Sequence, residues 1–220
     1  MTYGKFQDVV DYVRSCLDDD DYAHTCRVLN YALQILDTEK DADASVVILA
    51  AILHDVGRAS GETEDHARTG SEKSYAFLVE KGYADELAKQ VADCILTHCN
   101  CSETAPQTLE AKILFDADKL DTTGAVGTTR AIVQCRKDGL PMYILGEDSL
   151  LLVGKKEGPA SLIKMYKRKL KKLERVFFTK EAKKIAAKRQ PVMDKYFESL
   201  INEIDKNYKN GNELIEKYCN

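Results

Sequence analysis

The stretch Ser45-Val-Val-Ile-Leu-Ala-Ala-Ile-Leu-His-Asp55 decides the fold. Its apolar run from Val46 to Leu53 is far too short to cross a bilayer, so it predicts an apolar helix of a globular protein. A histidine and an aspartate end this helix, and Gly57 then gives the chain a place to turn. An ionisable pair is therefore expected where the helix leaves the core.

Other polar residues also lie on predicted core-facing stripes. His24 and His98 belong to helical stripes that are otherwise apolar, and Asp118 follows Leu114 by one turn. Burying ionisable groups is costly unless something compensates for their lost hydration. A lone inward histidine is usually a satisfied core residue, but several histidines and aspartates at such positions are explained together by a shared cation.

The rest of the chain favours helices as well. Gly and Pro are scarce, at 12 and 4 residues of 220, and Leu, Ala, Lys and Glu recur throughout. No segment shows a sustained apolar–polar alternation bounded by turns, so the expected fold class is all-α. The expected helices span about residues 4–17, 21–38, 44–56, 66–82, 84–99, 107–120, 122–138, 160–177, 180–205 and 211–218.

These helices are expected to form one domain with three parts. Residues 1–138 would be the helical core with the metal site, 139–159 a loop or lid, and 160–220 additional C-terminal helices packed on the core. The last part is rich in lysine, which fits solvated helix faces or a positive rim that attracts phosphorylated substrates. Pro191 predicts a kink or a break in its helix.

Charge and cysteine content limit the partners and the compartment. A formal net charge of −4 gives no reason to expect a stable nucleic-acid complex. No membrane segment and no secretory signal are apparent. The seven scattered cysteines fit reduced thiols in a cytoplasmic protein better than a disulfide framework.

The order of these residues resembles the HD domain superfamily of metal-dependent phosphohydrolases. The similarity lies in a histidine, a His-Asp pair and a distal aspartate, and it includes the segments Leu49-Ala-Ala-Ile-Leu-His-Asp-Val-Gly-Arg58 and Leu114-Phe-Asp-Ala-Asp-Lys-Leu-Asp121. The chain is most similar to the small bacterial HD nucleotide pyrophosphohydrolases. An HD-type helical bundle is therefore implied.

The resemblance also implies the metal ligands, which are His24, His54, Asp55 and Asp118. Asp116 and Asp121 compete for the last place. Two imidazoles and two carboxylates suit a divalent ion with open water positions, with Mn²⁺ expected first and Mg²⁺, Co²⁺, Ni²⁺ or Fe²⁺ as alternatives. By resemblance, His66 and His98 either contact the substrate phosphate beside one ion, which we favour, or bind a second ion.

The implied reaction is attack of a metal-bound water on a phosphorus atom of the substrate. Asp55 would take part through the ion, and Asp121 or Glu62 would position the water or take its proton; Glu64 and Asp65 are further candidates. Cationic side chains suit phosphate, and Arg58, Lys119 and Arg130 lie within or just after the two metal motifs. Together with His66 and His98 they form the expected substrate-binding set.

We therefore expect a hydrolase that acts on a small phosphorylated substrate, in the first place a nucleotide, as a pyrophosphohydrolase or a phosphatase. Two alternatives stay open: a non-catalytic regulatory HD module that binds a nucleotide or a metal, and a di-iron HD oxygenase. A homodimer is compatible with the sequence.

Overall fold

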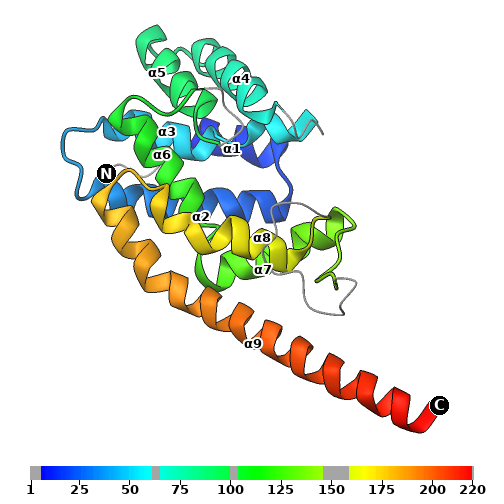
Figure 1. Cartoon of the computed structure of the whole chain (residues 1–220). Coiled ribbons are helices and arrows are strands. Elements are labelled where there is room, and N and C mark those ends of the chain that lie inside the picture. Colours follow the sequence, from blue (N-terminus) through cyan, green and yellow to red (C-terminus); the bar gives the residue numbers. More distant parts are fainter. Residues whose placement is uncertain (1–5, 61–64, 100–103, 146–158, 220) are drawn as a thin grey trace. The chain divides into compact units, whose positions relative to one another are not determined.

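The computed structural model of the chain describes residues 6–60, 65–99, 104–145 and 159–219 (Figure 1). These residues form α-helices and two short 3₁₀ helices and contain no strand, which confirms the all-α fold class. They divide into two compact units. The first unit comprises Met1–Asp121 and Phe177–Lys184, and the second comprises Thr122–Val176 and Ile185–Asn220.

The first unit is built around the apolar helix that the opening sequence stretch predicts. Its elements are α1 (Gln7–Cys16), α2 (Asp19–Leu36), α3 (Ala44–Leu53), η1 (Val56–Ser60), α4 (His66–Glu80), α5 (Asp85–Leu96) and α6 (Leu109–Leu120). Helix α3 contacts α1, α2, α5 and α6, and from Val46 to Leu53 all its side chains except that of Ile48 are buried. Asp43 starts this helix by accepting a hydrogen bond from the Ser45 amide at 2.7 Å.

A close backbone approach fixes the turn after α3. The 3₁₀ helix η1 packs on α4, and a Cβ atom at Gly57 would lie 2.7 Å from the Gly70 nitrogen and still closer to the His66 carbonyl oxygen. Only glycine allows the two backbones to come so near. The turn that the sequence predicts at Gly57 is therefore also the place where the backbone of η1 packs directly on the backbone of α4.

The second unit consists of α7 (Gly124–Lys137), α8 (Leu162–Arg168), η2 (Leu170–Arg175) and most of α9 (Lys180–Cys219). The Tyr166 ring stacks on Phe197 of α9 with centroids 4.1 Å apart, and its hydroxyl donates to Asp194 at 2.8 Å. The Gln190 side chain donates to the carbonyl oxygen of Leu170 at 3.3 Å. These contacts attach α9 to α8 and η2 within this unit.

Four expectations about the C-terminal part need correction or fall at least partly outside the described residues. The helix expected over 160–177 is instead α8 followed by η2, and the two helices expected over 180–205 and 211–218 are one, α9. Of the kink or break expected at Pro191, the break is absent because α9 continues through this residue, and the kink stays a prediction. Proline frees the carbonyl four residues earlier, which here belongs to Ala187, and both residues are exposed, so water can solvate that group. Most of the expected loop or lid over 139–159 lies outside the described residues.

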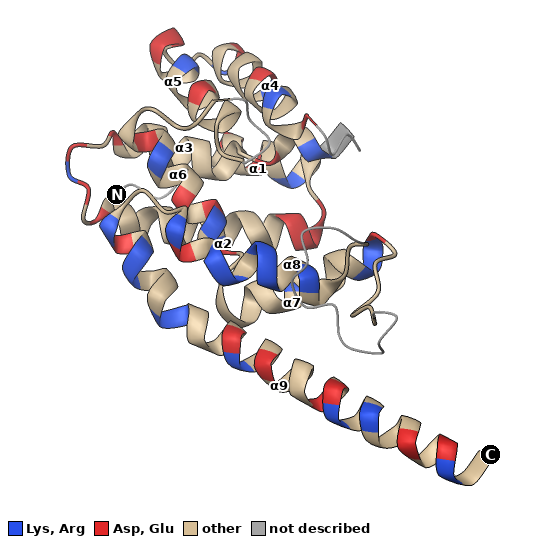
Figure 2. Cartoon of the chain, viewed as in Figure 1, with Lys and Arg blue, Asp and Glu red and all other residues tan. Residues whose placement is uncertain are grey.

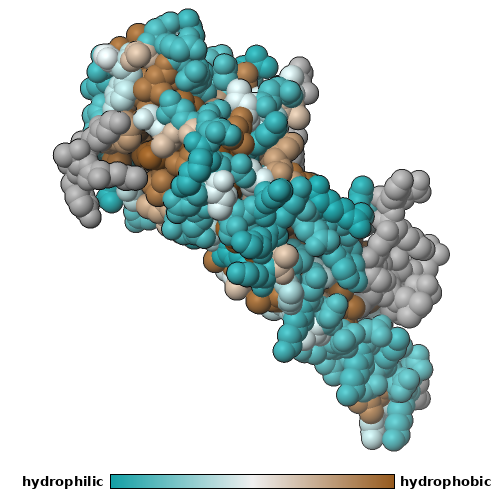
Figure 3. Space-filling view, turned by 90° about the vertical axis from the view of Figure 1, so that its left-hand side faces the viewer, coloured by the Kyte–Doolittle hydropathy of each residue, from teal (hydrophilic) through white to brown (hydrophobic). Residues whose placement is uncertain are grey.

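The surface of α9 changes along its length. Figure 2 shows mainly basic residues on its first turns and both charge signs farther on. Its last turns keep three large apolar side chains exposed, Leu214, Ile215 and Tyr218, and brown surface is visible at that end in Figure 3. None of the helices in the described part of the chain combines the length and apolarity that a membrane crossing requires.

Candidate metal centre

Three separate helices of the first unit bring the predicted ligands together. His24 lies on the inner face of α2, His54 and Asp55 follow α3 directly, and Asp118 lies in the last turn of α6. The side chains of His24, His54 and Asp55 are almost wholly buried, at 3%, 0% and 1% exposure, and Asp118 is 14% exposed. Ionisable groups so deeply buried need partners that compensate for lost hydration.

The ligand atoms of these four residues face one another. The Nε2 atom of His24 lies 3.4 Å from Nε2 of His54, 3.6 Å from Oδ2 of Asp55 and 3.3 Å from Oδ1 of Asp118. The Nε2 atom of His54 is 3.4 Å from the same Asp55 oxygen. Two atoms that each bind an ion at about 2.1 Å are about 3.0–3.5 Å apart at angles between octahedral and tetrahedral, so this spacing fits one divalent ion.

A second group meets at the other oxygen of the same aspartate. Oδ1 of Asp55 lies 3.7 Å from Nε2 of His98 and 4.0 Å from Nε2 of His66. His66 begins α4, and His98 follows the end of α5. Asp55, His66 and His98 therefore form a second set of atoms close enough to hold an ion, with Asp55 common to both sets.

The histidine rings are oriented by hydrogen bonds on their outer nitrogen. Nδ1 of His54 lies 3.0 Å from the Ala51 carbonyl oxygen, and Nδ1 of His98 lies 2.6 Å from that of Ile95. Because a carbonyl oxygen can only accept, these Nδ1 atoms carry the hydrogen. In a neutral imidazole the lone pair then belongs to Nε2, which is the nitrogen that faces Asp55.

Two cationic side chains lie directly beside the carboxylates. Nε of Arg58 is 2.8 Å from Oδ1 of Asp55, and Nζ of Lys119 is 2.7 Å from Oδ2 of Asp118. Burial alone raises the pKa of Asp55, but the neighbouring His54, His98 and Arg58 outweigh it and hold that pKa well below its usual range. For Asp118, Lys119 and His24 likewise outweigh burial, so its pKa is also well below the usual range. Both ligands are thus carboxylates at neutral pH.

One buried oxygen supports the fit of a cation. Oδ1 of Asp55 is buried and lies at ion-pair distance from Nε of Arg58, but it has no hydrogen bond of good geometry. A buried acceptor without a donor is costly. A divalent ion on the nitrogen and oxygen donors present would satisfy it, and this donor set suits Mn²⁺ and similar ions.

The remaining predicted residues are placed as follows. Asp121 is fully buried beside His24, and Glu62 and Glu64 lie outside the described residues. Asp65 is exposed and pairs with Arg68 at 3.0 Å. Arg130 lies on α7 in the second unit, and its contact with substrate stays a prediction.

Some participants were missed by sequence reasoning. Arg27 was not predicted, although its position one turn after His24 on α2 is a signal that could have identified it. The carbonyl groups of Ala51 and Ile95 leave no such signal, because every residue has one. Asp116, a competitor for the fourth ligand, instead accepts hydrogen bonds from the Phe178 and Thr179 amides at 2.9 and 2.7 Å.

The described cysteines differ in state. Cys99, directly after His98, is disulfide-bonded, which departs from the expectation that all cysteines are reduced. Among the described residues, five other cysteines are free thiols: Cys16, Cys26, Cys94, Cys135 and Cys219.

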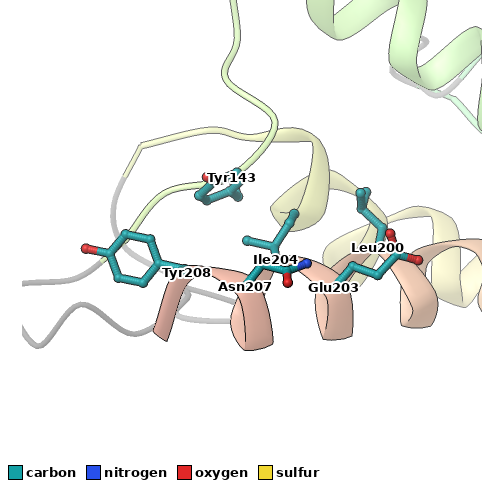
Figure 4. A pocket seen from close by; sticks show the side chains of 6 residues that line it. All are labelled: Tyr143, Leu200, Glu203, Ile204, Asn207 and Tyr208. Atoms are coloured by element: carbon teal, nitrogen blue, oxygen red, sulfur yellow. The ribbon is translucent and has the colours of Figure 1, made fainter. Parts of the chain in front are cut away.

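The second unit contains a separate surface pocket of about 340 Å³ (Figure 4). It is lined by Tyr143, Leu200, Glu203, Ile204, Asn207 and Tyr208. No predicted site residue lines it, and its lining holds neither a histidine nor a cationic side chain for phosphate.

Comparisons with known proteins identify a matching family model and similar structures. The family model described as "HD domain" matches residues 21–123. Bacillus subtilis YpgQ is 33% identical over 141 residues, which are 60% of this chain and 67% of YpgQ. Its crystal structure has a TM-score of 0.70 to this one at 28% identity, with 90% of this chain and 94% of that chain covered.

Two further solved structures add detail. YpgQ has also been crystallised in complex with ADP, and that structure has a TM-score of 0.70 at 28% identity, covering 90% of this chain and 93% of that chain. An HD-superfamily hydrolase from Bacillus thuringiensis has a TM-score of 0.66 at 26% identity, covering 90% of this chain and 96% of that chain.

Proposed function

This chain belongs to the HD domain family, and we propose that it is a divalent-metal-dependent phosphohydrolase that acts on a nucleotide. The convergence of His24 Nε2, His54 Nε2 and one oxygen each of Asp55 and Asp118 is the observation that carries this proposal. The description of solved neighbours as HD-superfamily hydrolases supports hydrolysis as the reaction type.

Four residues of the proposed site would hold the divalent ion. When bound, a divalent ion supplies a Lewis acid that lowers the pKa of a coordinated water and polarises a phosphoryl oxygen. His24, His54, Asp55 and Asp118 would hold the ion, and Mn²⁺ is our first candidate. Their rings and carboxylates are already oriented, so little reorganisation accompanies binding.

The cations beside the carboxylates are the proposed phosphate-binding groups. In this structure Arg58 and Lys119 neutralise Asp55 and Asp118. An ion bound by the same carboxylates would replace this neutralising charge, which would leave both cations available to phosphate oxygens of the substrate. Nε2 of His66 lies 3.4 Å from a terminal nitrogen of Arg58, so His66 would contact the same phosphate.

A nucleotide is proposed because the similar protein YpgQ has been crystallised with ADP. Whether pyrophosphate or phosphate leaves depends on which phosphorus atom lies at the ion. We propose pyrophosphate release, in keeping with the resemblance to small HD pyrophosphohydrolases.

The test is a panel of nucleoside mono-, di- and triphosphates assayed with Mn²⁺, Mg²⁺, Co²⁺ or Ni²⁺, with products separated by chromatography. We expect metal-dependent turnover that Asp55→Ala abolishes and that the exposed loop variant Asp41→Ala retains. A folded wild-type protein that binds both metal and nucleotide without turnover would refute the enzyme and favour a regulatory module.

A second candidate function is a di-iron oxygenase, which one observation favours. The two sets that share Asp55 have the arrangement of a two-metal centre with a bridging carboxylate. Iron analysis of protein purified from iron-supplied cells distinguishes the two. Two iron atoms per chain together with oxygen consumption would favour the oxygenase, whereas one exchangeable divalent ion would support the phosphohydrolase.

A further inference from the structure

Asp121 lies beside the proposed metal centre without facing the shared ligand atoms. It directly follows α6, it is fully buried, and its carboxylate contacts two residues of α2. Oδ2 accepts a hydrogen bond from Nδ1 of His24 at 2.8 Å. Arg27 donates from Nε to Oδ1 at 2.7 Å and from a terminal nitrogen to Oδ2 at 3.0 Å.

This arrangement determines the hydrogen position on the His24 ring. A bidentate arginine stabilises the carboxylate form of Asp121, and a carboxylate can only accept hydrogen bonds. Nδ1 of His24 must therefore carry the hydrogen. The lone pair of the neutral ring then lies on Nε2, which is the atom 3.3 Å from Asp118 and 3.4 Å from His54.

His24 differs in this respect from the other oriented histidines. His54 and His98 are fixed by backbone carbonyls three residues before them, which no substitution removes. His24 is fixed by a side chain 97 residues away, on another element. Both Asp121 oxygens are engaged and neither is exposed, so this carboxylate is poorly placed to accept a proton from a water.

We infer that Asp121, held by Arg27, is a positioning residue that fixes the tautomer of His24 and presents its Nε2 atom to the ion. The inference deepens the proposed function and rests on its metal centre. Removal of such an outer partner of a ligating histidine typically weakens metal binding about 10- to 100-fold.

The test is the variant Asp121→Asn. Its amide can donate to Nδ1 of His24, which favours the tautomer with the hydrogen on Nε2 and blocks the ligand atom. We expect the Mn²⁺ dissociation constant, measured by titration calorimetry, to rise about 10- to 100-fold. In the metal-free protein, ¹⁵N NMR of labelled histidines should show Nε2 of His24 changing from unprotonated to protonated.

Two further variants separate positioning from simple loss of structure. Asp116→Asn changes another fully buried acid of α6, one whose hydrogen bonds go to Phe178 and Thr179, so we expect unaltered His24 signals and Mn²⁺ affinity. The second variant is Arg27→Gln. Because the Arg27 side chain is 35% exposed, this variant should fold even if the Asp121→Asn protein does not. It should weaken Mn²⁺ binding in the same direction by a smaller factor.

Unchanged Mn²⁺ affinity and unchanged His24 signals in Asp121→Asn, or in Arg27→Gln if only that variant folds, would overturn the inference. A wild-type protein whose metal-free His24 carries its hydrogen on Nε2 would also overturn it. A failure of the proposed function would give a different experimental result from a failure of this inference. If the wild type shows the expected His24 tautomer and binds Mn²⁺ but hydrolyses no nucleotide, the phosphohydrolase proposal fails and the positioning role stands.

Discussion

Replacement of Gly57 by alanine should damage both the first unit and its metal centre. The added Cβ would lie 2.7 Å from the Gly70 nitrogen and closer still to the His66 carbonyl oxygen, whereas real Cβ contacts essentially never fall below 3.0 Å. Both obstacles are backbone atoms of α4. No side-chain rotation can relieve the clash, so η1 and α4 must move apart.

The expected magnitude follows from that geometry. Overpacking a well-packed interior costs about 1–3 kcal/mol, and a backbone obstacle places Gly57→Ala at the upper end, about 3 kcal/mol. For a protein of this size each kcal/mol lowers the melting temperature by about 2–4 °C, so a fall of about 6–12 °C is expected. Because Asp55 and His66 lie on either side of the turn, Mn²⁺ affinity should fall as well.

Thermal unfolding followed by circular dichroism measures the first effect, and calorimetric titration with Mn²⁺ measures the second. The matched control is Gly211→Ala in α9, where the new Cβ meets no heavy atom within 4 Å. Alanine is favoured over glycine inside a helix by about 1 kcal/mol, so this control should melt at or above the wild-type temperature. A Gly57→Ala protein that melts like the wild type and keeps its Mn²⁺ affinity would refute the close approach.

Three other perturbations have defined outcomes. Burial raises the pKa of Cys94 to about 12, so at pH 8 alkylation followed by mass spectrometry should modify exposed Cys26 and Cys219 and spare Cys94; equal rates would contradict its burial. Because that thiol stays protonated in the folded state, its contribution to stability is complete below the unfolded pKa of about 8.5 and should be lost as the pH rises through 12. Asp116→Ala leaves the Phe178 and Thr179 donors unpaired and should cost about 3 kcal/mol, with faster hydrogen exchange just before α9; unchanged exchange there would argue against these hydrogen bonds. Free Mn²⁺ at about 100 times its dissociation constant should add about 2.7 kcal/mol of stability, reversed by EDTA and absent in His24→Ala; an equal gain in that variant would exclude His24 as a ligand.

The sequence was sufficient for the parts of the site that depend on local pattern. The apolar run of α3, the inward stripe of α2 and the context of Asp118 each carry helical periodicity, and periodicity indicates which side chains face the interior. When several helices all direct ionisable side chains inward, few packing arrangements of these helices give those side chains partners. The inward placement of His24, His54 and Asp55 was therefore predictable from pattern, whereas the choice of Asp118 as the fourth ligand came from the resemblance to the HD superfamily.

The roles of the supporting residues were not predictable in the same way. Which of Asp116, Asp118 and Asp121 faces the histidines depends on the rotation of α6 against α2, and a difference of two or three residues changes the partner completely. The pairing of Arg27 with Asp121 joins residues 94 positions apart. Continuity of α9 through Pro191 likewise depends on the exposure of Ala187, a tertiary property.

The end of α6 and the residue that follows it hold three acids with three different contacts within six residues. Asp116 anchors the chain entering α9, Asp118 faces the shared ligand atoms, and Asp121 fixes His24. The chain at 177–179 and the metal centre are thus connected through the end of α6. Because each acid is engaged with a different element, a shift of this segment by one residue would break all three interactions at once.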